Sequence, residues 1–193
     1  MKPPKWVPAI KPPRIARSGE RYPQQIDRAP SSLLAGGVPW LSVMLASLIP
    51  GWAIIVSAPI VPPLGLMVLL GWRLLRPGLL PLWAGLPLGL FDDLFSGQPL
   101  GSAVLLWSLA MIVLEAVETR FPWRNFLQDW MAAAGLLTAA IFFGTVFANL
   151  SGGSTRLSVM FPQLAVAVLG YPLIARLVAL LDRFRLLNVR ELG

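Results

Sequence analysis

Six apolar stretches, each close to the length of a bilayer-crossing helix, dominate this 193-residue chain. A helix needs about 20 apolar residues to cross the hydrocarbon core of a membrane. Charged residues make up only 13% of the chain and hydrophobic residues 56%, with a mean hydropathy of +0.69. The stretches cover residues 38–57, 59–75, 78–96, 99–117, 127–150 and 158–176. The sequence therefore predicts an all-α polytopic membrane helix bundle with six transmembrane helices.

The second stretch departs from a regular span at both of its ends. Pro59, Pro62 and Pro63 stand at its start, where they interrupt helical hydrogen bonding. Arg73 lies near its end and would have to extend its charged group toward the membrane surface. We expect this helix to be shortened or partly unwound.

The positions of the basic residues predict the orientation of the bundle. With a cytoplasmic N-terminus, fifteen of the sixteen lysines and arginines fall on the inside, and only Arg156 falls outside. Such an excess of basic residues on one side marks the cytoplasmic face. We therefore expect both termini inside, with a six-helix membrane domain at 38–181 and a cytoplasmic end at 182–193. The segment 177–193 is expected to continue the last helix into a basic amphipathic end.

Residues 1–37 carry seven basic residues and several prolines but no apolar run, which predicts a disordered cytoplasmic tail. Two interpretations remain open for it: an arm resting on anionic lipids, or a docking peptide for a partner. The net charge of +7 follows membrane topology, so we expect no nucleic-acid partner. No cleavable targeting segment is expected.

Cysteine and histidine are both absent from the chain. Their absence excludes disulfides, thiol nucleophiles, imidazole bases and the usual zinc ligand sets. Glu115 and Glu118 stand beside Arg120 and Arg124, so we expect them to form salt bridges at the membrane surface. We predict no catalytic residue, no cofactor and no metal site.

The most informative segment is GLFDDLFSGQPLG at 89–101, in which two adjacent acids lie within an apolar stretch. Ionisable groups in membrane segments are costly and usually functional. Gly85, Gly89, Asp92, Asp93 and Ser96 fall within one arc of about 100° on a helix. The two glycines allow another helix to approach closely, which predicts either a packing seam within the chain or an interface with a partner.

Asp92 and Asp93 would lie near the outer end of the third span, before SGQP breaks the helix. There a carboxylate can accept hydrogen bonds from backbone amides that begin the next helix, around Leu100 and Gly101. Intramembrane proteolysis is disfavoured, because adjacent residues diverge by about 100° around a helix instead of converging on one water. The predicted structural or partner-binding residues are Gly85, Gly89, Asp92, Asp93, Gly97, Pro99 and Gly101.

Four features follow one another in the chain: a proline-broken short span, RLLRP, WAGLPLGLFDDLFSGQPLG and a further apolar span. This order resembles the bacterial rod shape-determining MreD family, of the alphaproteobacterial type, over residues 38–181. The characteristic pattern, G-L-x-x-D-x-x-x-G-x-x-L-G, falls on Gly89, Leu90, Asp93, Gly97, Leu100 and Gly101. On this register Asp92 is an additional acid. The basic tail is not part of the pattern.

The resemblance implies a non-enzymatic inner-membrane component of the cell-wall elongation complex. It further implies association with the bitopic protein MreC, and through it with MreB filaments, RodA and a penicillin-binding transpeptidase. The implied fold is similar to the S-component of energy-coupling-factor transporters, with six helices around a cavity. An alternative from another class is a small-molecule-binding membrane subunit of a vitamin-type transporter, because Asp92 and Asp93 lie near the expected ligand face.

Overall fold

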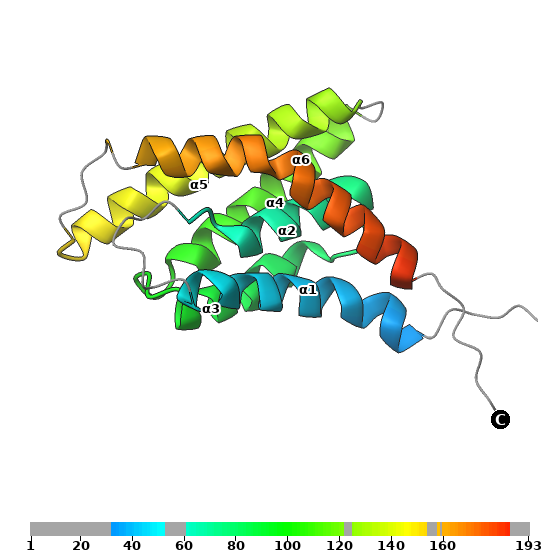
Figure 1. Ribbon diagram of the computed structural model, residues 1–193, viewed down its shortest axis with the longest axis horizontal. Coiled ribbons are helices and arrows are strands. Elements are labelled where there is room, and N and C mark those ends of the chain that lie inside the picture. The colour runs from blue at the N-terminus through cyan, green and yellow to red at the C-terminus, as the bar shows by residue number, and fades with distance from the viewer. Residues whose placement is uncertain (1–31, 53–60, 122–124, 154–157, 159, 186–193) are drawn as a thin grey trace, which may run out of the picture.

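The computed structural model describes residues 32–52, 61–121, 125–153, 158 and 160–185. Within these ranges every regular element is a helix, and successive long helices alternate in direction (Figure 1). The elements are α1 (Ser32–Trp52), α2 (Leu64–Leu75), the short 3₁₀ helix η1 (Leu82–Ala84), α3 (Gly85–Phe95), α4 (Ser102–Arg120), α5 (Phe126–Leu150) and α6 (Met160–Arg185). The predicted class, an all-α membrane helix bundle, is confirmed.

The helices differ more in length than the sequence suggested. Within the described part of the chain, α4, α5 and α6 are long and apolar enough to cross a membrane, and α1 contains a shorter apolar helix at 36–51. With 12 and 11 residues, α2 and α3 rise only about 18 and 16 Å. Six helices are therefore present in the described residues, but six full-length spans are not.

Prolines and a glycine explain the two short helices. The cap of α2 is Pro63, so the expected shortening of the second span is confirmed. The prediction of a third helix at 78–96 was wrong for the first part of that range. There Gly78 adopts φ +83° and Pro81 is extended, so regular α-helix begins only at Gly85.

The short helix α2 lies at the centre of the bundle and contacts α1, α4, α5 and α6 (Figure 1). In Figure 1, α2 and α4 lie between α1 and α3 on one side and α5 and α6 on the other. Ten consecutive residues of α2 are buried, and all but Arg73 are apolar, which suits a helix enclosed by protein. A helix too short to span a bilayer is tolerated where protein surrounds it.

The structure adds detail at both ends of the helix bundle. First, α1 begins at Ser32, inside the segment expected to be a disordered tail at 1–37, whose remaining residues lie outside the described part of the chain. Second, α6 continues as predicted beyond residue 176, to Arg185, and bends along its length (Figure 1), where Pro172 removes a backbone donor. Asp182 and Arg185 are buried, so the bundle extends into the segment expected to be its cytoplasmic end.

Candidate functional site

The glycines of α3 pack its backbone directly against α4. A Cβ atom on Gly85 would lie 2.9 Å from the Cα of Ser108, and one on Gly89 would lie 2.7 Å from the carbonyl oxygen of Ala103. Only glycine fits at such distances, and close contact is what associates helices in lipid. The structure thus contains the packing seam, here formed within one chain. On the other side of α3 the leucines are exposed: Leu86, Leu90 and Leu94.

The turn between α3 and α4 depends on two glycines and a proline. Gly97 has φ +69° and Gly101 has φ +94°, a region that other residues rarely adopt. The carbonyl oxygen of Pro99 accepts a hydrogen bond from the Ser102 amide at 3.0 Å. These three residues reverse the chain so that the start of α4 faces the end of α3.

Asp93 binds the N-terminus of α4 with both carboxylate oxygens. Oδ2 accepts from the amides of Gly101 at 2.9 Å and Val104 at 3.2 Å, and Oδ1 accepts from the Ala103 amide at 2.9 Å. The Ser102 hydroxyl adds a fourth bond, to Oδ1, at 3.2 Å. The first amides of a helix lack partners within it, and its dipole favours an anion there. The predicted capping role is therefore confirmed for Asp93, which is only 3% exposed.

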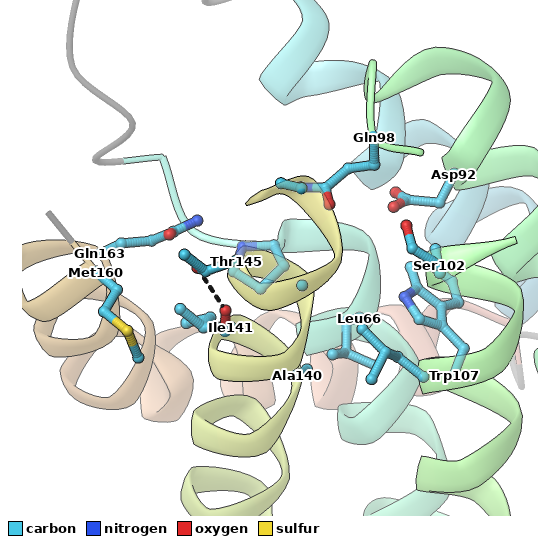
Figure 2. Close-up of a pocket in the computed structure, with 15 residues that line it drawn as sticks. Leu66, Asp92, Gln98, Ser102, Trp107, Ala140, Ile141, Thr145, Met160 and Gln163 are labelled. Carbon is cyan, nitrogen blue, oxygen red and sulfur yellow. Dashed lines mark hydrogen bonds between the residues drawn. The ribbon is translucent and has the colours of Figure 1, made fainter. Parts of the chain in front are cut away.

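Asp92 diverges from this cap and lines a cavity of about 180 Å³ (Figure 2). The Ser47 hydroxyl of α1 lies near this carboxylate but outside hydrogen-bond geometry. The cavity is bounded by α2, α3, the α3–α4 turn, α4, α5 and α6, whose lining residues are Pro63, Leu66, Asp92, Gln98, Ser102, Ala103, Leu106, Trp107, Ala140, Ile141, Gly144, Thr145, Ala148, Met160 and Gln163. We refer to it as the Asp92 cavity.

Several polar side chains of the Asp92 cavity already donate hydrogen bonds to other groups. Gln163 Nε2 donates to the carbonyl oxygen of Val61 at 2.9 Å, which joins α6 to the segment before α2. Thr145 Oγ1 donates to the carbonyl oxygen of Ile141 at 2.8 Å. Figure 2 shows Asp92, Gln98 and Ser102 on one side of the space and Thr145 and Gln163 on the other.

A second polar cluster lies at the opposite end of the bundle, where Arg73 is 3% exposed. Its guanidinium pairs with Glu115 and, at 2.9 Å, with Glu118, and it donates to the carbonyl oxygen of Leu80 at 3.3 Å. The charge of Arg73 is thus paired with acidic side chains inside the bundle. The acids had been expected to pair with Arg120 and Arg124; the structure gives them Arg73, while Arg124 lies outside the described residues.

The same end holds a cluster that the sequence did not reveal. The Asp182 carboxylate accepts from Arg76 at 2.9 Å and from Arg185 at 2.8 Å. The Arg185 guanidinium also lies 5.6 Å from the ring centre of Trp72, whose indole donates to Ser42 at 2.8 Å. Asp182 lies 106 residues from Arg76, so only tertiary structure pairs them. The i, i+3 spacing of Asp182 and Arg185 was the only local signal.

Among the described residues, no three acidic side chains are grouped so that they could hold a metal ion. Fold and site together define a helical membrane protein with a capped α3–α4 hairpin and a partly open cavity lined by polar and apolar side chains. No family model and no solved structure matches the chain.

One curated protein is similar over part of the sequence. It is the Na⁺/H⁺ antiporter NhaA of Tolumonas auensis, with 31% identity over 96 residues, covering 48% of this chain and 24% of the antiporter. The chain thus spans about a quarter of that protein, and the similarity supports a membrane protein.

Proposed function

We propose that this protein is a non-enzymatic, multi-pass component of the bacterial inner membrane that acts in the cell-wall elongation complex. In this role it binds an MreC-like bitopic protein and through it links MreB filaments with RodA and a penicillin-binding transpeptidase. Its helices are proposed to cross the membrane with both termini in the cytoplasm. The α3–α4 hairpin would then present its capped turn to the outer side.

The proposal is supported mainly by one observation: the residues of the MreD-like motif build the α3–α4 hairpin. Asp93 accepts three backbone amides of α4, Gly89 contacts the α4 backbone, and Gly97 and Gly101 adopt positive φ. Because the motif residues serve to hold the two helices together, they support a scaffold role for this protein. The exposed leucines of α3 then offer an apolar face to lipid or to the partner's membrane helix.

Depletion and complementation in the source bacterium test the proposal. Depletion should convert rods into spheres, and the wild-type gene should restore the rods. Asp93→Ala should restore them poorly, and the neighbouring substitution Asp92→Asn should restore them well because Asp92 makes no part of the cap. Normal rods after complete depletion would refute the role in cell shape.

A second candidate function is a small-molecule-binding membrane subunit of a transporter. It is favoured by the Asp92 cavity, which has polar groups on several helices, and by the partial similarity to an antiporter. Native mass spectrometry of protein purified from its own membrane tests this candidate. A stoichiometric bound metabolite would support it, and an empty cavity in every preparation would oppose it.

A further inference from the structure

The two adjacent acids differ in how their negative charge is compensated. Asp93 receives three amide hydrogens and one hydroxyl hydrogen. Asp92 instead faces the Asp92 cavity, and no lysine or arginine is among the described residues that line this space. A carboxylate within a membrane protein is costly unless a cation or hydrogen-bond donors accompany it.

The other polar groups of the cavity include both donors and acceptors, because Gln98 and the indole of Trp107 also line it. Ser102, Thr145 and Gln163 direct donors to Asp93, Ile141 and Val61 respectively. The hydroxyl and amide oxygen lone pairs of these side chains therefore remain available to accept hydrogen bonds from a ligand in the cavity. A ligand with N–H donors would satisfy these oxygens, whereas an anion would lie beside the Asp92 carboxylate with no lysine or arginine in the lining to offset the repulsion.

One aromatic side chain contributes to the lining of the cavity. Trp107 is buried and lines the cavity below Ser102 (Figure 2). A cation near the face of an indole is attracted by the ring's quadrupole. The carboxylate and the oxygen lone pairs favour a cation, and the indole offers it an aromatic surface.

The volume limits the size of that cation. A cavity of about 180 Å³ is similar to the engineered cavities of about 150 Å³ that hold benzene. It is larger than one bare metal ion needs. We propose that the Asp92 cavity binds a small organic ammonium ion, with the ammonium group at Asp92 and the hydrocarbon part toward Leu66 and Trp107.

This inference is independent of the scaffold role, because the cavity lies inside the bundle, and it gives the second candidate function a ligand class. Isothermal titration calorimetry on the full chain in phosphatidylcholine nanodiscs tests it with propylammonium chloride as the probe. Propanol serves as the neutral analogue, and sodium chloride as the inorganic cation. We expect saturable binding of propylammonium and at least tenfold weaker binding of propanol and sodium.

Two variants locate the binding site. Asp92→Asn should weaken propylammonium binding at least tenfold, whereas Asp129→Asn, the same charge change near the start of α5, should not. Gly144→Val keeps every charge but fills the cavity, so it should also weaken binding. Gly144→Ala adds a methyl at ordinary contact distance, 3.8 Å from Gln98, and serves as its control. If Asp92→Asn fails to fold, the Gly144 pair still decides.

Several outcomes would overturn the assignment. Equal binding of propanol would mean a neutral ligand, so that the cation assignment fails while ligand binding survives. Tighter binding of sodium would make the site one for an inorganic cation. Absence of saturable binding by all three probes would refute the proposed site and weigh against the transporter-subunit function, leaving the scaffold function untouched.

Discussion

Asp92 and Asp93 are adjacent and chemically identical, yet one completes a helix cap and the other faces a cavity. The 100° step between neighbouring helical residues separates their roles. The cap could be predicted from the sequence. A glycine-rich helix break follows the two acids, and the next helix begins with backbone amides that lack partners within that helix. The cavity could not be predicted, because its lining comes from helices far apart in the chain.

Asp93→Ala should lower the free energy of unfolding by about 2–4 kcal/mol, since it leaves three amides at the start of α4, one of them buried, without their acceptor. Asp93→Asn keeps an oxygen but loses the charge, so its effect should be smaller. Unfolding in mixed micelles with increasing dodecyl sulfate measures both. Asp92→Asn is the matched control, and a cost equal to that of Asp93→Ala would contradict the assignment of the cap.

Arg73→Ala should cost about 3–5 kcal/mol, because it leaves Glu115 and Glu118 without their buried cation. Arg120→Ala removes an exposed arginine from the last turn of α4 and should change stability by less than about 0.5 kcal/mol. The same micelle unfolding assay compares the two variants. Equal, small effects would show that the Arg73 cluster contributes little.

At the scale of elements, the α3–α4 hairpin was the part most accessible to prediction. Glycine spacing, the adjacent acids and the turn sequence all lie within residues 85–101, so local reasoning was sufficient. The length of α2 and the burial of Arg73 were less accessible. Both depend on α1, α4, α5 and α6 enclosing a short helix, which no local pattern encodes.

Gly89→Ala should destabilise the hairpin by about 1–3 kcal/mol, because the new methyl would lie 2.7 Å from the Ala103 carbonyl oxygen. Gly135→Ala on α5 is the control, since nothing lies within 4 Å of its Cβ position. That substitution should be neutral or slightly stabilising, as alanine is the better helix former. A neutral Gly89→Ala would show that α3 can move away from α4 at no cost.

At the scale of the whole molecule, the alternating helices place the Arg73 cluster and the Asp92 cavity at opposite ends of the bundle. The distribution of basic residues predicts that the Arg73 end is cytoplasmic. Because the chain lacks cysteine, single cysteines can test this orientation.

Thr119, in the last turn of α4, and Ser151, directly after α5, are exposed and lie at opposite ends of the bundle, so they suit this experiment. A membrane-impermeant maleimide added to intact spheroplasts should label Ser151→Cys, and it should label Thr119→Cys only after permeabilisation. The reverse pattern would invert the proposed topology. Labelling of both positions in intact spheroplasts would contradict the alternating arrangement in the membrane.

If the protein is a scaffold of the elongation complex, it must associate with a bitopic partner. Affinity purification of the full chain from native membranes, followed by quantitative mass spectrometry, measures this directly. The scaffold role predicts an MreC-like protein in near-stoichiometric amount with the wild type and with Asp92→Asn, and clearly less with Asp93→Ala. Purification of the intact wild-type protein without any such partner would contradict it.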